Sequence, residues 1–163
     1  MNQENLVNAL QTIPLFQEMD SEHFEKFKEV ASLVEVDAEQ VLFREGDQED
    51  YLYIVVQGRV AIEMQFPGRG RIRIYTAEPL DFVGWSSVTP VVRARTAGAV
   101  AVLPSCLVRL DASKVRAMID EDHEIGYIIM RRVANVVASR LLVTRLQLMD
   151  MFSHPAAEDC TNV

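Results

Sequence analysis

The spacing of hydrophobic and polar residues divides the chain into a helical zone, a zone of strands and a second helical zone. In the first zone, the segments LVNALQTI and DSEHFEKFKEVASLV carry apolar residues every three or four positions, on either side of Pro14. This is the period of an amphipathic helix. Asp20 or Ser21 stands where a helix cap is expected, because either side chain accepts a hydrogen bond from a free backbone N–H group. The pattern predicts N-terminal helices over residues 4–31.

The middle zone, residues 32–110, has the composition of short strands joined by turns. VLFREGDQEDYLYIVVQGRVAIEMQF is rich in valine, isoleucine, tyrosine and phenylalanine and is interrupted at EGD and QGR. PGRG, at residues 67–70, predicts a hairpin turn, and RIRIY after it alternates charged and apolar residues with the period of a strand. Many short strands with turns at this spacing favour a small barrel or sandwich.

The last zone begins with a short helix in DASKVRAMI, capped by Asp111 or Ser113, and continues as one long helix that ends near residues 153–155. Residues spaced alternately three and four apart run along the long helix and form a seam typical of a coiled coil. They are Tyr127, Met130, Ala134, Val137, Leu141, Thr144, Leu148 and Met151. The pattern predicts helices over residues 112–153 and a flexible tail at 154–163.

The seam can pack inside its own chain or against a second copy. Packing within the chain is the commoner use of such a stripe. A second apolar stripe on the first half of the helix is available for that purpose, formed by Ile125, Ile129, Val133 and Val136. A small barrel, however, leaves little surface to cover so long a helix. We therefore expect the distal half of the seam to associate with a second copy, giving a homodimer through residues 127–151.

Composition limits the classes of partner. Hydrophobic residues make up 49% and charged residues 25% of the 163 positions, which is ordinary for one globular domain, here residues 1–153. The net charge of −8 opposes binding to nucleic acid and to anionic lipid headgroups, so neither nucleic acid nor a membrane is expected as a partner. The first residues lack a secretory pattern, and no stretch is long and apolar enough for a membrane span. With Cys106 and Cys160 as the two cysteines, no disulfide framework is expected, and the sequence predicts a cytoplasmic protein.

Two segments carry a resemblance to a known family. VLFREGDQEDYLYIVVQGRVAIE is similar to the first half of the cyclic-nucleotide-binding domain, with Gly46 and Gly58 at its two turn glycines. DFVGWSSVTPVVRART resembles the phosphate-binding cassette of that domain. The chain as a whole resembles the effector domain of the catabolite activator protein-like superfamily, in which the last helix forms a dimer interface. The resemblance implies an α+β fold: a β-roll (jelly-roll barrel) with N-terminal helices and a long C-terminal helix.

The cassette has a physical logic, because a buried phosphate needs paired hydrogen-bond donors. A guanidinium donates two parallel hydrogen bonds, and backbone N–H groups at the start of a short helix add a favourable dipole. By the family pattern Arg93 meets the phosphate, helped by the backbone N–H of Ala94. Gly84, Ser86 and Ser87 would form the turn and the start of the short helix.

Three further residues leave alternatives open. Arg95 is either a second contact to the anion or part of a pair of surface arginines on the outward face of a strand. Trp85 stands where the family has a glutamate that accepts a hydrogen bond from the ribose hydroxyl. An indole has no acceptor, so that contact is lost, and Trp85 either stacks on a flat ligand or fills the pocket. Thr144 either touches a purine edge across the dimer or donates to the carbonyl one helical turn back.

These observations predict a regulatory sensor rather than an enzyme. It would bind a cyclic nucleotide, such as cyclic AMP or cyclic GMP, or a related small anionic ligand, and signal through the dimer helix to an unknown protein partner. The alternative is a degenerate, ligand-free domain that serves as a dimeric interaction module. No cofactor or metal is expected, since His23, His123 and His154 are far apart and no cluster has metal spacing. No helix-turn-helix follows the long helix, so DNA recognition by the usual route is not expected.

Overall fold

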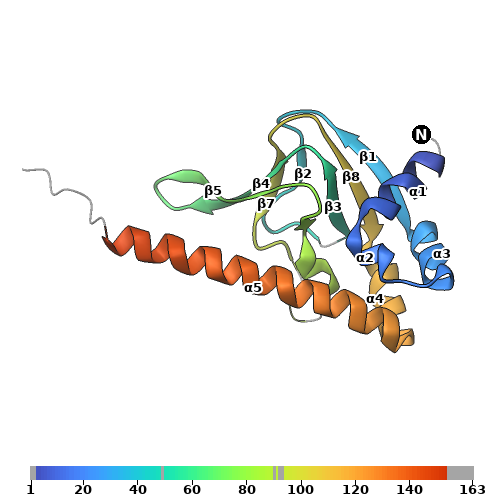
Figure 1. The fold of residues 1–163 in the computed structure, drawn as a ribbon. Coiled ribbons are helices and arrows are strands. Elements are labelled where there is room, and N and C mark those ends of the chain that lie inside the picture. The colour runs from blue at the N-terminus through green and yellow to red at the C-terminus, as the bar shows by residue number, and fades with distance from the viewer. Residues whose placement is uncertain (1–2, 49, 90, 92–93, 154–163) are drawn as a thin grey trace, which may run out of the picture.

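The structure, a computed structural model, describes residues 3–48, 50–89, 91 and 94–153, and the predicted flexible tail at 154–163 lies outside them. Its helical segments are α1 (Gln3–Thr12), α2 (Pro14–Gln17), α3 (Ser21–Val30), the 3-10 helix η1 (Trp85–Val88), α4 (Ala112–Glu121) and α5 (His123–Ser153). Its strands are β1 (Ala31–Val36), β2 (Val41–Phe43), β3 (Tyr51–Gln57), β4 (Val60–Phe66), β5 (Gly70–Ala77), β6 (Phe82–Val83), β7 (Gly98–Ala101) and β8 (Ser105–Asp111). The predicted α+β fold is confirmed (Figure 1).

Several local sequence signals occupy the positions that the pattern predicts. The carboxylates of Asp20 and Asp111 each accept a hydrogen bond from a backbone N–H in the first turn of α3 and of α4. The turn between β4 and β5 comprises residues 67–69, and Gly70, the last residue of the predicted turn, begins β5. Gly46 and Gly58 have φ angles of +86° and +97°, a region that side-chain-bearing residues rarely adopt. The turns that shape the strand zone are therefore encoded locally.

The strands form two four-stranded antiparallel sheets. One sheet has the order β1-β8-β3-β6 and the other the order β2-β7-β4-β5. The two sheets face one another and make the β-roll, with α1, α2 and α3 packed at one end of it (Figure 1). The β4–β5 hairpin projects from the other end, above the distal part of α5 (Figure 1).

Alternation along β3 explains why this strand is almost continuously apolar. Leu52 and Ile54 point into a core shared with the helices, whereas Tyr53 and Val55 point into the interior of the roll. Because neighbouring residues of a strand face opposite sides, both faces of β3 are buried. Such a strand reads as an apolar run rather than as an alternation of apolar and polar residues.

The long helix α5 has two different environments. Its first half carries the buried residues Ile125, Ile128, Ile129 and Val133 and packs on the helical core. Beyond about residue 140 most of its side chains are exposed, and the helix runs past the roll beneath the β4–β5 hairpin (Figure 1). No helix among the described residues is long and apolar enough to cross a membrane.

Candidate functional site

The cassette segment begins with a turn that requires glycine. Gly84 follows β6 with a φ of +77° and ψ of 32°, the left-handed conformation, and η1 starts at the next residue. A side chain at this position would also meet another group, because a Cβ built on Gly84 lies 2.3 Å from Nη1 of Arg95. The absence of a side chain therefore allows both the turn and the close approach of a guanidinium.

That guanidinium belongs to Arg95, which is only 4% exposed. Nη1 of Arg95 donates to the carbonyl oxygen of Gly84 at 3.1 Å, and Nη2 donates to the carbonyl oxygen of Tyr51 on β3. Its Cζ atom lies 4.1 Å from the centroid of the Phe43 ring. The interpretation of Arg95 as a surface arginine is therefore wrong: carbonyl oxygens brought close by the fold draw its side chain inward. Arg93, the predicted phosphate contact, lies outside the described residues.

A cavity of about 160 Å³ lies between the cassette, the roll and α5. Its aromatic wall is formed by Phe43, Tyr75, Phe82 and Trp85. Aliphatic side chains from β4, β5, β6 and α5 complete the apolar surface, and the guanidinium groups of Arg95 and Arg140 enter from different elements. No aspartate or glutamate is among the described residues that line the cavity. The cavity is thus apolar with a positive charge.

The helix α5 forms one side of this cavity. The Arg140 side chain stacks on the ring of Tyr75 in β5, and Nε2 of Gln147 donates to the carbonyl oxygen of Ile74 at 3.2 Å. Partial burial lowers the pKa of Arg140 to about 10, because desolvation disfavours the charged form. Arg140 nevertheless carries its charge at neutral pH. The helix is therefore attached to the roll beside the cavity through this arginine.

Comparison with known proteins identifies the fold around this cavity. The model of the cyclic nucleotide-binding domain family matches residues 33–122, more than half of the chain, including the cassette. This chain belongs to the cyclic nucleotide-binding domain family. Members of the family are regulatory sensors and not enzymes, in agreement with the prediction from the sequence. No curated protein matches the chain.

Solved structures share the fold of this cyclic nucleotide-binding domain at low sequence identity. A cyclic nucleotide-binding domain from Methylobacillus flagellatus is 20% identical with a TM-score of 0.73, over 91% of this chain and 83% of that chain. The sensor domain of the transcriptional regulator DNR from Pseudomonas aeruginosa is 18% identical with a TM-score of 0.70, over 85% and 93%. The N-terminal domain of a transcriptional regulator from Streptomyces coelicolor is 26% identical with a TM-score of 0.62, over 83% and 94%.

The structure brings some of the predicted ligand-binding residues to the cavity and leaves others away from it. The residues at the cavity are Gly84, Trp85, Ser86, Arg95 and Thr144. Ser87 is buried in η1 but is not part of the cavity wall, and Ala94 is exposed and also absent from it. Contact of any of these residues with a ligand remains a prediction.

Trp85 and Thr144 each had two interpretations. Trp85 packs partly on the helical core and also lines the cavity, which stays open beside it. The indole therefore does not fill the pocket of this cyclic nucleotide-binding domain. The hydroxyl of Thr144 donates to the carbonyl oxygen of Arg140 at 2.8 Å, the bond to the preceding helical turn that the sequence left open. Its oxygen can still accept a hydrogen bond from a ligand.

Sequence reasoning missed Arg140, which supplies the positive charge on the α5 side of the cavity. A signal was present, because Arg140 precedes Thr144 by four residues and so shares its helix face. Tyr75 and Phe43 were also missed, since their strands, β5 and β2, belong to the sheet that faces the sheet of β6 across the roll. These contacts join positions that are distant in the sequence.

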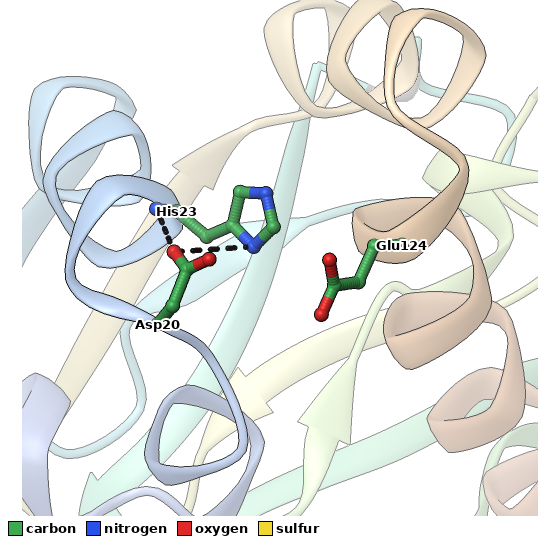
Figure 2. A group of neighbouring side chains, drawn as sticks. All are labelled: Asp20, His23 and Glu124. Atoms are coloured by element: carbon green, nitrogen blue, oxygen red, sulfur yellow. Dashed lines mark hydrogen bonds and ion pairs between the residues drawn. The ribbon is translucent and has the colours of Figure 1, made fainter.

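A second polar group lies away from the cavity, although the sequence predicted no metal cluster. Ligand atoms of Asp20, His23 and Glu124 lie within 4.8 Å of one another (Figure 2). The described contacts give Asp20 and His23 structural roles at helix ends. Asp20 caps α3, and Nε2 of His23 contacts the carboxylate of Asp122 at 3.0 Å, which in turn accepts backbone hydrogen bonds at the start of α5. The group therefore ties α3 to α5.

Proposed function

We propose that this cyclic nucleotide-binding domain is a sensor that binds a cyclic nucleotide or a related small organic anion in the cassette cavity and signals through α5. One observation carries the proposal: the guanidinium groups of Arg95 and Arg140 border the same apolar cavity. Arg95 belongs to the cassette and Arg140 to the long helix. An anion that contacts both would link the state of the roll to the position of the helix. A cytoplasmic location is part of the proposal.

The charge of the cavity favours an anion over a neutral or cationic ligand. Arg140 is partly buried, and no carboxylate among the described residues forms an ion pair with it. A charge held in a poorly solvated place is costly unless an opposite charge reaches it. Ligand binding would supply that charge. The net charge of −8 for the whole chain makes this local positive site distinct from its surroundings.

Signalling would act through the contacts that join α5 to β5. Arg140 stacks on Tyr75, and Gln147 donates to the backbone of β5 one to two helical turns further along. A ligand that draws the Arg140 guanidinium into the cavity competes with the Tyr75 contact. Because the proximal half of α5 is fixed in the core, a change at Arg140 would move mainly the distal half.

The distal half of α5 is the proposed dimer interface. Three seam residues there are exposed although they are apolar: Leu141 is 49% exposed, Leu148 is 52% exposed and Met151 is 65% exposed. Exposed apolar residues at heptad spacing are buried when a second helix pairs with them. A homodimer would place two sensor cavities beside one shared pair of helices. A protein partner could respond to the position of those helices.

A ligand-free interaction module is the second candidate. Two observations favour it: Trp85 replaces the acceptor that the family uses for the ribose, and the Arg95 guanidinium already donates to two backbone carbonyls. In this case Arg95 has a structural role and α5 alone carries the interaction. The two candidates differ in whether any small anion stabilises the protein.

Thermal unfolding separates them. The purified chain is heated alone and with cyclic AMP, cyclic GMP and a panel of small carboxylates, sulfonates and phosphates, each with a neutral analogue as control. At about one hundred times its dissociation constant, a true ligand adds about 2.7 kcal/mol of stability, or roughly 5–10 °C in Tm for a domain of this size. If no anion raises Tm more than its neutral analogue, the sensor proposal is wrong and the interaction module is supported.

A further inference from the structure

The size of the cassette cavity favours a small ligand. Its volume is about 160 Å³. An apolar protein cavity of roughly 150 Å³ holds one benzene molecule. A cyclic nucleotide joins a base of one or two rings to a ribose and a cyclic phosphate, which requires considerably more space. One ring with a small substituent therefore matches the volume of the cavity.

The lining of the cavity selects the type of ring. Phe43, Tyr75, Phe82 and Trp85 contribute aromatic side chains from four separate elements. Aromatic rings bind one another by offset stacking or edge-to-face contact, which is worth more than the burial of area alone. Isoleucine and valine side chains extend this apolar wall, and its uncharged polar side chains among the described residues are Ser86, Thr96 and Thr144. A flat apolar ring fits the aromatic part of the wall.

The positive groups define the substituent. The Arg95 guanidinium is engaged with the carbonyl oxygens of Gly84 and Tyr51, so it contributes mainly its charge. Arg140 stacks on Tyr75 and makes no ion pair with a described carboxylate. A guanidinium presents two parallel N–H donors that match the two oxygens of a carboxylate. Among the described lining residues, Arg140 is the guanidinium that can pair with an anionic group of the ligand.

We propose that the ligand of the cassette cavity is a monocyclic aromatic carboxylate. Its ring lies among the four aromatic side chains, and its carboxylate pairs with Arg140. The inference rests on the proposed sensor function and replaces the cyclic nucleotide with a smaller anion. The described lining has no acidic residue, which disfavours an amino group on the ligand, because an ammonium would face the guanidinium groups of Arg95 and Arg140.

The proposal also explains why a tryptophan occupies position 85. The family places a carboxylate acceptor at this position for a ribose hydroxyl, and a ligand without ribose makes that acceptor unnecessary. An indole instead adds a large apolar surface to the wall. The substitution and the small volume of the cavity therefore point to the same class of ligand.

Isothermal titration calorimetry of the full chain tests the ligand class with four probes. Phenylacetate is the expected ligand; 2-phenylethanol keeps the ring without the charge, 2-phenylethylammonium reverses the charge, and cyclic AMP is the nucleotide. We expect saturable binding of phenylacetate with one site per chain. Binding of the neutral and the cationic probe is expected to be at least tenfold weaker, because each leaves the positive charge of Arg140 unpaired.

Two variants test the position of the carboxylate. Arg140→Gln removes the guanidinium, and Arg145→Gln is the matched control, since Arg145 is exposed on the same helix and is not a cavity residue. We expect Arg140→Gln to weaken phenylacetate binding by about tenfold or more and Arg145→Gln to leave it unchanged. Far-ultraviolet circular dichroism and the Tm of both variants verify that they are folded. A variant Arg140→Lys, which keeps the charge but not the fork, is expected to fall between the two.

The outcomes distinguish the ligand class proposed here from the sensor function on which it rests. Binding of cyclic AMP without binding of phenylacetate overturns this inference and leaves the sensor function standing. Equal binding of phenylacetate and 2-phenylethanol overturns the role of the carboxylate, and equal binding by wild type and Arg140→Gln overturns its position. If neither phenylacetate nor cyclic AMP binds, the ligand class proposed here is wrong, and the wider anion panel then decides the sensor function itself.

Discussion

Replacement of Gly84 by alanine tests the geometry of the cassette at its most crowded point. The new Cβ would lie 2.3 Å from Nη1, 3.0 Å from Cζ and 3.2 Å from Nη2 of Arg95. Non-bonded heavy atoms are at their optimal separation near 3.5–4.0 Å, so the guanidinium must move by roughly 1 Å. Gly68 supplies a matched control, because its φ of +76° is nearly that of Gly84 while nothing lies within 4 Å of a Cβ built on it.

The expected cost has two parts. Both variants force alanine into the left-handed region, which costs about 1–2 kcal/mol. Only Gly84→Ala also displaces the buried Arg95 side chain from the carbonyl oxygen of Gly84 and from the Phe43 ring. A hydrogen bond from a charged donor contributes about 1.5–3 kcal/mol, and the ring contact about 0.5–2 kcal/mol. We therefore expect Gly84→Ala to lose about 2–5 kcal/mol more of the free energy of unfolding than Gly68→Ala.

Urea unfolding followed by far-ultraviolet circular dichroism measures this difference. The fluorescence of Trp85, the single tryptophan, reports in parallel on the cassette itself. We expect Gly84→Ala to shift the tryptophan emission of the folded protein, and Gly68→Ala to leave it unchanged. Equal losses of stability in the two variants would refute the close packing of Arg95 against Gly84.

Three further predictions concern the helix, the roll and the pH response. The double variant Leu141→Glu/Leu148→Glu is expected to be monomeric by light scattering, because it places charges in the proposed dimer seam, and a variant that remains dimeric would remove the seam as the interface. Gly58→Ala is expected to destabilise the roll by more than the 1–2 kcal/mol of backbone strain, since its Cβ would lie 2.7 Å from the backbone Cα of Ser105; unfolding in urea measures the loss, and a loss no larger than the strain would contradict it. Hydrogen bonds from the backbone of α5 lower the pKa of Asp122, so its contribution to stability is full above about pH 4 and is lost as the pH falls through the lowered value. The stability difference between wild type and Asp122→Asn should therefore shrink on acidification below pH 4, and a constant difference would disprove the linkage.

The parts of the fold that were predictable from the sequence depend on local chemistry. The caps at Asp20 and Asp111, the turn between β4 and β5 and the glycines at 46 and 58 each follow from one short segment. The spacing of apolar residues supplied the order of helices, strands and helices, and the family resemblance added the β-roll. Because these features are encoded within a few residues, they can be predicted without knowledge of the tertiary structure.

The details of the site depend on contacts between distant segments. The sequence RAR does not reveal that Arg95 turns inward, because the carbonyl oxygen of Tyr51 that receives its hydrogen bond is 44 residues away in the chain. Arg140 comes to Tyr75 only through the path of α5 past the β4–β5 hairpin. The group around His23 likewise joins residues separated by about one hundred positions (Figure 2). Such pairings follow from how whole elements pack, which residue spacing alone does not encode.

The central claim is that the cassette cavity binds a small anion in contact with α5, and titration of Trp85 fluorescence tests it most directly. Trp85 is the single tryptophan and forms part of the cavity wall, so a bound ligand changes its surroundings. With phenylacetate and then with the other anions of the panel, we expect a saturable change in emission for wild type and Arg145→Gln and a strongly weakened one for Arg140→Gln. The claim would be contradicted if no anion gave a saturable change in emission, or if the change were the same in all three proteins.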